Sequence, residues 1–309
     1  MTTPTQRGIR SAQTSVLLNA SLAITKLVAG VLGHTYALIA DAVESTADVF
    51  GSLIVWRGLH VSGRAADEDY PFGYGKAESL AAAVVALILM GSALFITVHA
   101  VREIRTPHLT PAPWTLLVLV GVVSVKTWLS RHVGAVGDEI GSQAVRADAS
   151  HHLSDALTSA AAFIGISIAL LGSRYRGGTG WESADDWTAL LASLLIAYNG
   201  VALLRPAVHD LMDRAPGKDV VDAVRRAAES VPEVLATEKL AVRRTGLVYR
   251  VTLHVQTAED MTLHDAHVLS GKVKSAIRTA EPRVDSVLVH MEPYDPQAAP
   301  PSVDREIGT

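Results

Sequence analysis

The chain contains no cysteine among its 309 residues. Disulfide bonds and thiolate metal sites are therefore excluded, and any bound metal must be held by His, Asp and Glu side chains. Basic residues are not in excess either, and the formal net charge of -4 argues against a nucleic acid-binding protein. The N-terminus up to Gln13 has no apolar stretch of signal-peptide length followed by a small-residue cleavage site. We expect residues 1–13 to form a short cytoplasmic tail.

Charged residues are scarce, at 19% of the chain against 49% hydrophobic residues, and the mean hydropathy is +0.27. Such a chain is too apolar for an ordinary soluble protein, and its apolar residues come in blocks. Each of six blocks has roughly the twenty residues that span a bilayer core. They cover residues 14–32, 36–60, 80–101, 113–129, 146–172 and 187–211. The pattern predicts an α-helical membrane protein, with a six-helix transmembrane domain over residues 14–213.

The distribution of Lys and Arg predicts the orientation of these helices. With the N-terminus inside, the segments that face the cytoplasm hold more Lys and Arg than the outer loops. We therefore expect both termini in the cytoplasm, and the protein in a bacterial plasma membrane.

The composition changes after Asp213-Arg-Ala-Pro-Gly217, where charged residues become frequent. Helical spacing over 218–231 and 262–279, and strand-like alternation over 240–244, 249–256 and 284–291, predict a small α+β module. We expect a cytoplasmic domain over residues 214–294. The tail over 295–309, rich in Pro and charge, is expected to be disordered.

Two of the apolar blocks carry acidic and His residues at helical spacing. Asp41, Glu44 and Asp48 share one face of the second helix, and His151 and Asp155 share one face of the fifth. Polar groups inside membrane helices are costly and usually mark a substrate path, although a polar contact between helices is the plainer alternative. The spacing predicts a tetrahedral divalent-metal site of Glu44, Asp48, His151 and Asp155, with Asp41 as an auxiliary ligand.

Two neighbours of these residues have other expected roles. His152 faces about 100° away from His151 on a helix, so we interpret it as a structural or gating residue. Asp148 lies three residues before His151 and is expected near the cytoplasmic mouth of the site. Ligands of this kind also titrate near neutral pH, so protons and metal compete for them, which predicts proton-for-metal exchange.

Three motifs match a known family. They are Tyr70-Pro-Phe-Gly-Tyr-Gly-Lys-Ala-Glu-Ser79, Ala40-Asp-Ala-Val-Glu-Ser-Thr-Ala-Asp48 and His151-His-Leu-Ser-Asp155. The chain resembles the cation diffusion facilitators over nearly all of residues 10–294. The resemblance implies a proton-coupled efflux transporter for Zn²⁺ or another divalent metal, with six helices and a metallochaperone-like cytoplasmic domain. It also implies a homodimer.

The resemblance carries over the same transport site of Glu44, Asp48, His151 and Asp155. Glu44 is a departure, because zinc-transporting members usually have His or Asp there. One His with three carboxylates is a harder ligand set than a two-His site, so Fe²⁺, Mn²⁺, Co²⁺ or Ni²⁺ stay open as the main substrate.

In the C-terminal domain, the resemblance implies regulatory metal ligands. They are His254, His267 and His290, with Glu238 and Glu292 at positions where relatives use His or Asp. It also implies a structural charge pair between Lys76 and Asp213, against the alternative of two ordinary interfacial charges.

Two other functions are weighed against efflux by alternating access. A membrane-anchored metal sensor would not need ligands buried at mid-helix. A membrane-embedded metallohydrolase would need a general base, and there is no His-Glu-x-x-His motif. We therefore predict a transporter that is not an enzyme, binds no organic cofactor and no nucleic acid, and interacts with divalent metal ions, protons and the lipid bilayer.

Overall fold

The computed structural model describes residues 3–32, 36–104, 115–175 and 184–294. Inside the helices some side chains lie outside the described part, and those of Asp41 and Glu44 are among them. The chain divides into two compact units, Met1–Leu211 and Met212–Thr309. Each unit is described by itself.

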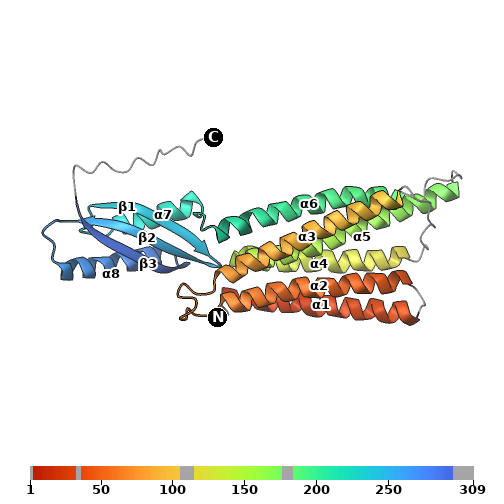
Figure 1. Ribbon diagram of the computed structural model, residues 1–309, viewed down its shortest axis with the longest axis horizontal. Coiled ribbons are helices and arrows are strands. Elements are labelled where there is room, and N and C mark those ends of the chain that lie inside the picture. The colour runs from red at the N-terminus through yellow and green to blue at the C-terminus, as the bar shows by residue number, and fades with distance from the viewer. Residues whose placement is uncertain (1–2, 33–35, 105–114, 176–183, 295–309) are drawn as a thin grey trace. The chain divides into compact units, whose positions relative to one another are not determined.

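The first unit consists, in its described residues, of six long helices (Figure 1). They are α1 (Pro4–Leu32), α2 (Tyr36–Ser62), α3 (Lys76–Glu103), α4 (Thr115–Ile140), α5 (Gln143–Tyr175) and α6 (Ala184–Leu211). Four stretches of the described residues are long and apolar enough to cross a membrane. These are Lys76–Arg102, Leu116–Ile140, Gln143–Gly172 and Leu190–Leu211.

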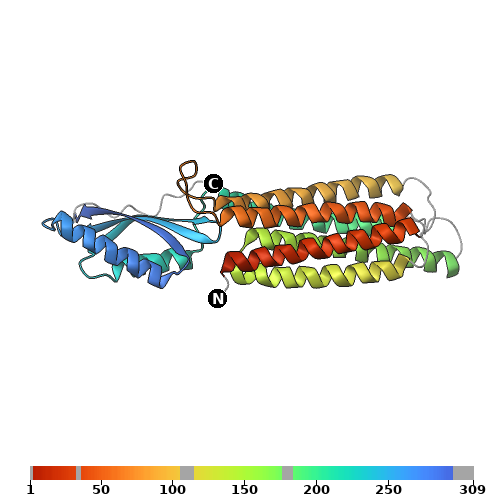
Figure 2. The ribbon, with the colours of Figure 1, turned by 90° about the horizontal axis from the view of Figure 1, so that it is seen from below.

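Helix α5 is the central element of this bundle, since it contacts each of α1, α2, α3, α4 and α6. Helix α1 also packs along α2, and α3 packs along α6; Figure 2 shows the helices running lengthwise beside one another. Large apolar side chains point outward, with Phe95 71%, Leu117 79% and Leu191 66% exposed. An apolar exterior of this extent is typical of a surface that faces lipid.

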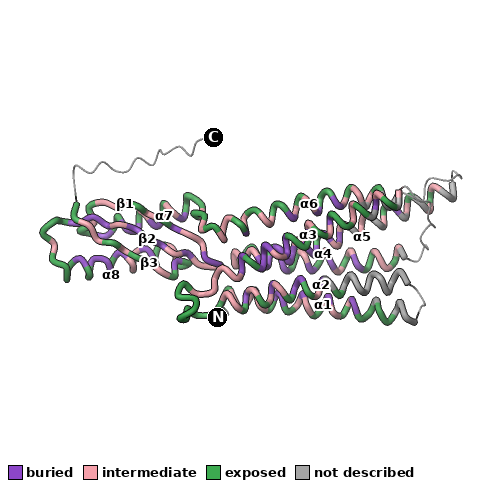
Figure 3. Tube along the Cα trace, in the orientation of Figure 1, coloured by how far each residue is buried: buried purple, intermediate pink, exposed green. Residues whose placement is uncertain are grey.

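The core of the bundle is built largely from small side chains, and it gathers where α1, α3 and α5 begin and α2, α4 and α6 end (Figure 3). Val55 and Leu59 of α2 pack there with Ala82 of α3. At Gly58 a Cβ atom would come within 2.4 Å of the Ala81 Cβ. Glycine at this position therefore permits the close approach of α2 and α3.

The motif that begins α3 ties together three helix ends. Glu78 is fully buried, and its Oε1 accepts hydrogen bonds from the Ser142 hydroxyl (2.8 Å) and the Ala144 backbone N–H (3.1 Å). Those two donors stand at the start of α5, just after the left-handed Gly141 (φ 68°) that ends α4. Lys76 Nζ donates to the Leu211 carbonyl oxygen at 3.0 Å, at the end of α6. The motif thus fixes α3 against the helix that carries His151.

The second unit is a three-stranded sheet with two helices. Its elements are α7 (Lys218–Glu229), β1 (Ala236–Thr245), β2 (Val248–Thr257), α8 (Leu263–Ala280) and β3 (Val284–Pro293). The strand order is β1-β2-β3, with β1 antiparallel and β3 parallel to β2. Helix α8 is the connection that the parallel pair requires.

The two faces of this sheet differ in character. Val251, Leu253 and Val255 of β2 are buried in a core with Leu269 and Val273 of α8. The alternate residues of β2 face the other way. His254 lies on that face, directly opposite His290 of β3 in the register.

Candidate metal centre

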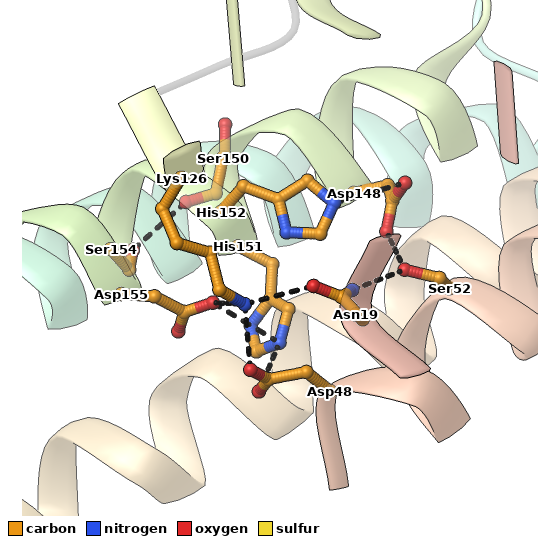
Figure 4. Close-up of polar contacts among 10 residues, drawn as sticks. All are labelled: Asn19, Asp48, Ser52, Lys126, Asp148, Ser150, His151, His152, Ser154 and Asp155. Atoms are coloured by element: carbon orange, nitrogen blue, oxygen red, sulfur yellow. Dashed lines mark hydrogen bonds and ion pairs between the residues drawn. The ribbon is translucent and has the colours of Figure 1, made fainter. Parts of the chain in front are cut away.

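Three of the four residues predicted for the transport site come together between α2 and α5 (Figure 4). His151 Nε2 lies 3.1 Å from Asp48 Oδ1 and 4.0 Å from Asp155 Oδ2. One ligand atom from each of the three residues lies within 4.8 Å of the others. Asp48 and His151 are buried, with residue exposures of 7% and 6%, and Asp155 is half-buried. An imidazole and two carboxylates at this spacing can bind a divalent cation.

The fourth predicted ligand, Glu44, has a side chain outside the described residues, as does Asp41. Glu44 lies on α2 one helical turn before Asp48. Its membership of the site stays a prediction.

Lys126 of α4 also enters the site. It is 2% exposed, and its Nζ donates to Asp48 Oδ2 at 2.7 Å and to Asp155 Oδ2 at 2.9 Å. Its third hydrogen bond, at 3.0 Å, goes to Asn19 Oδ1 of α1. Four helices therefore supply polar groups to one cluster.

A chain of polar side chains continues from this cluster. Asn19 Nδ2 donates to Ser52 Oγ at 3.3 Å, and Ser52 donates to Asp148 Oδ1 at 2.8 Å. Asp148 Oδ2 lies 3.6 Å from His152 Nε2. Asp148 is 1% exposed and is a buried member of this chain of side chains. Its place near the cytoplasmic mouth of the site stays a prediction. His152 is fully buried beside it.

Neither Lys126 nor Asn19 was identified as a site residue from the sequence. The available signal was a single lysine within an otherwise apolar block, since an ionisable residue inside a membrane helix is a functional candidate by default. Sequence spacing relates residues of one helix only. It could not show that α4 and α1 face the α2–α5 site.

The C-terminal unit contains a second cluster of possible ligands. His254 Nδ1 lies 2.6 Å from Glu292 Oε1, and His290 Nε2 lies 3.6 Å from the same oxygen. The two His rings are tilted by 41°, with centroids 4.7 Å apart. Lys239 Nζ lies 3.9 Å from Glu292 Oε1. Desolvation raises the pKa of Glu292, but the hydrogen bond and the charge of His254 outweigh it, so the pKa is below its usual value.

Of the other residues predicted for this domain, Glu238 lies directly opposite His254 in the β1–β2 register, but its carboxylate has a different hydrogen-bond partner. Glu238 Oε1 accepts a hydrogen bond from Gln256 Nε2 at 2.9 Å, and His267 is exposed on α8. Asp213 Oδ2 accepts from Arg243 Nη1 at 3.2 Å. Lys76 belongs to the first unit and Asp213 to the second, so their pairing stays a prediction.

Comparisons with known proteins agree with this organisation. Residues 12–212 match the family model of the cation efflux transmembrane domain. Residues 216–294 match the model of the cytoplasmic domain of cation efflux proteins.

Similar whole chains are known. The manganese efflux system protein MneP of Bacillus subtilis (strain 168) is 27% identical over 281 residues, which cover 91% of this chain and 94% of that protein. The cation-efflux pump FieF of Yersinia pestis (strain Pestoides F) is 32% identical over 296 residues, covering 93% of each. Among solved structures, a MamM-CTD variant is 24% identical and covers 25% of this chain and 98% of that chain, with a TM-score of 0.25.

The family consists of membrane transporters of divalent cations, not of enzymes. The two matches together cover almost the whole chain, from the first helix to the last strand. The chain therefore belongs to the cation diffusion facilitator family of cation efflux proteins.

Proposed function

We propose that this protein exports a divalent metal cation from the cytoplasm in exchange for protons, through a site of Glu44, Asp48, His151 and Asp155. The observation that carries the proposal is the convergence of Asp48, His151 and Asp155, whose ligand atoms lie within 4.8 Å of one another inside the helix bundle. Buried carboxylates in an apolar bundle are costly unless a cation balances them.

Proton exchange follows from the same contacts. A ring nitrogen 3.1 Å from a carboxylate oxygen implies a proton between them, so His151 Nε2–H donates to Asp48 Oδ1. A metal that binds Nε2 must take the place of this proton, because a ligating nitrogen offers its lone pair. We propose that the ring is an imidazolium beside the two carboxylates, so that metal binding releases a proton and protons from the opposite side favour release of the metal. Alternating access of the site to the two sides of the membrane completes the cycle.

We propose Zn²⁺ as the main cargo, because Zn²⁺ accepts both imidazole and carboxylate ligands in tetrahedral sites. A second candidate is Mn²⁺. The carboxylate-rich ligand set favours it, and so does the likeness to a manganese efflux protein. Fe²⁺, Co²⁺ and Ni²⁺ are further candidates for the same ligands.

We propose a regulatory metal site in the C-terminal domain at His254, His290 and Glu292. Their contacts within 2.6–3.6 Å of Glu292 Oε1 support it. Glu238 and His267 would complete the site if a second copy of the chain contributes to it. We accordingly propose a homodimer that assembles through this domain, with Lys76 and Asp213 as the charge pair that links the domain to the helices.

The proposed orientation places both chain ends in the cytoplasm of a bacterial cell, with the helices in the plasma membrane. An even number of crossings returns the chain to its starting side, and the distribution of Lys and Arg favours the cytoplasm for that side.

Transport can be tested with the purified full chain in proteoliposomes that carry a metal-sensitive dye and an imposed pH gradient. Uptake of Zn²⁺ and Mn²⁺ should follow the proton gradient, and Asp155→Ala should lower it by at least about a hundredfold. Asp138→Ala is the matched control, because Asp138 is exposed on α4 and pairs with Arg146 at the surface. Normal uptake by Asp155→Ala would refute the site, and uptake that ignores the pH gradient would refute proton exchange.

A further inference from the structure

The cluster around Asp48, His151 and Asp155 contains one residue that metal binding does not explain. Lys126 brings a positive charge into a site that is proposed to bind a dication. Its ammonium group has three N–H donors, and the three acceptors around it are Asp48, Asp155 and Asn19. A lysine this deeply buried is costly without such partners.

We propose that Lys126 is a tethered cation that competes with the transported metal for Asp48 and Asp155. The inference rests on the proposed transport site. The ammonium group and a metal would use the same carboxylates, and the lysine would leave them when the metal binds. It would return to them when the metal is released.

The shared oxygens carry this argument. The lysine binds Oδ2 of both Asp48 and Asp155, and Asp155 Oδ2 also lies 4.0 Å from His151 Nε2. A zinc–oxygen bond is about 2.1 Å long. A zinc ion on either oxygen would then lie no more than about 5 Å from the ammonium nitrogen. Repulsion between a dication and an ammonium at that distance is strong in a protein interior, so the two cations exclude each other.

The positions of these acceptors fit an exchange of the ammonium group for a metal ion better than a permanent ion pair that only holds the helices together. The acceptors come from α1, α2 and α5, while Lys126 is carried on α4 by a flexible stem of four methylene groups. Carboxylate and amide oxygens are also ligands that divalent cations accept. The ammonium group therefore occupies the same set of oxygen ligands that a metal ion would use, and not a separate position next to the metal site.

A competitor of this kind has a definite consequence for transport. It weakens metal binding, because each binding event must also displace the lysine from two carboxylates. It speeds release for the same reason. It also keeps these carboxylates paired when the metal has left, so that the bundle does not hold two bare negative charges in an apolar surrounding.

The first test measures Zn²⁺ affinity and transport kinetics of the full chain for the wild type, Lys126→Met, Lys126→Gln and Lys126→Arg. The two neutral variants should bind Zn²⁺ at least about tenfold more tightly, with a lower KM and a lower kcat. Lys126→Arg keeps the charge and should stay close to the wild type. Folding is checked by size-exclusion chromatography and by the thermal midpoint. A folded neutral variant with unchanged or weaker Zn²⁺ binding would overturn the proposal.

The second test uses the absence of cysteine from the chain, which makes the thiol of Lys126→Cys unique. The purified variant is modified with 2-aminoethyl methanethiosulfonate, which restores an ammonium group, or with propyl methanethiosulfonate, which is neutral. Mass spectrometry verifies each product. The aminoethyl product should bind Zn²⁺ at least about tenfold more weakly than the propyl product of the same protein. Equal affinities of the two products would contradict competition by charge.

Two further variants separate this inference from the proposed function. His151→Ala and Asp155→Ala should abolish Zn²⁺ binding in the helix bundle. If they do not, the transport site itself is wrong. If they do, but the charge at position 126 has no effect on affinity, only the role of Lys126 is refuted.

Discussion

The buried carboxylate of Glu78 offers a direct test of how the bundle positions its metal ligands. Glu78 Oε1 accepts from the Ser142 hydroxyl and the Ala144 N–H at the first turn of α5, the helix that carries His151 and Asp155. The substitution Glu78→Ala removes both acceptor contacts and leaves a buried backbone N–H without its partner. We expect it to destabilise the bundle and to make the position of α5 relative to α3 less well fixed.

The size of the effect follows from the contacts. A buried donor that loses its partner costs about 1–3 kcal/mol, and two donors are affected here. Ser142 can rotate its hydroxyl toward another acceptor, but the Ala144 N–H is fixed by the helix. We therefore expect a loss of about 2–4 kcal/mol for Glu78→Ala. Glu78→Gln keeps an oxygen at the same place and loses only the charge, so about 1 kcal/mol is expected.

These differences in the free energy of unfolding can be measured by titrating the full chain in detergent with SDS and recording its tryptophan fluorescence. Glu259→Ala is the matched control, because Glu259 is exposed in the C-terminal domain and should change stability by less than about 0.5 kcal/mol. Metal affinity should fall together with stability in Glu78→Ala. The reasoning is refuted if Glu78→Ala is as stable as the control, or if Glu78→Gln is the less stable of the two Glu78 variants.

Three more predictions can be checked with the same preparation. Gly58→Ala places a Cβ atom 2.4 Å from the Ala81 Cβ and should lower the free energy of unfolding by about 1–3 kcal/mol. Gly91→Ala, whose Cβ meets nothing within 4 Å, should raise it by up to about 1 kcal/mol. Equal effects of the two substitutions in the unfolding titration would contradict the close packing of α2 on α3. In an Asp155→Ala background, adding Glu292→Gln should lower the remaining bound Zn²⁺ per chain measured by equilibrium dialysis, while adding Glu259→Gln should not. Glu44→Asp should raise the ratio of Zn²⁺ to Mn²⁺ uptake in proteoliposomes, since the shorter side chain moves the carboxylate; an unchanged ratio would remove Glu44 from metal selection.

The elements of the fold could be predicted closely because two simple signals dominate this sequence. Blocks of apolar residues marked the helices, and the alternation from Tyr249 to Gln256 marked the central strand of the C-terminal unit. The helix ends were less certain. Helix α4 continues to Ile140, well beyond the end of its apolar block at residue 129, and α5 begins at Gln143, three residues before its block. Gly141 and the Glu78–Ser142 hydrogen bond mark where the two helices meet.

The candidate site could be predicted only as far as spacing along one helix reaches. The i,i+4 spacing identified His151 with Asp155, and Asp48 on a second helix was the natural counterpart. Lys126 lies on a third helix, and its partners follow from helix packing that the sequence does not encode in any short pattern. For the same reason the sequence did not show that Asp148 is joined through hydrogen bonds to Ser52 and Asn19 of other helices.

The distribution of packing in the bundle bears on how the site opens. The principal core cluster lies at the end where α6 leads into the C-terminal domain, and it includes Leu59 of α2, Leu129 of α4 and Ala147 of α5. Asp48, Lys126 and His151 lie further along these same helices, toward the other end, by roughly 5 to 17 Å at 1.5 Å per residue. In the proposed orientation, a cation that moves between the site and the cytoplasm would have to pass that core, and close-packed cores deform little. In that orientation, access from the cytoplasm requires whole helices to separate. Side-chain rotation alone would not open this path, so variants that fill the core near Ala147 should slow transport without weakening metal binding.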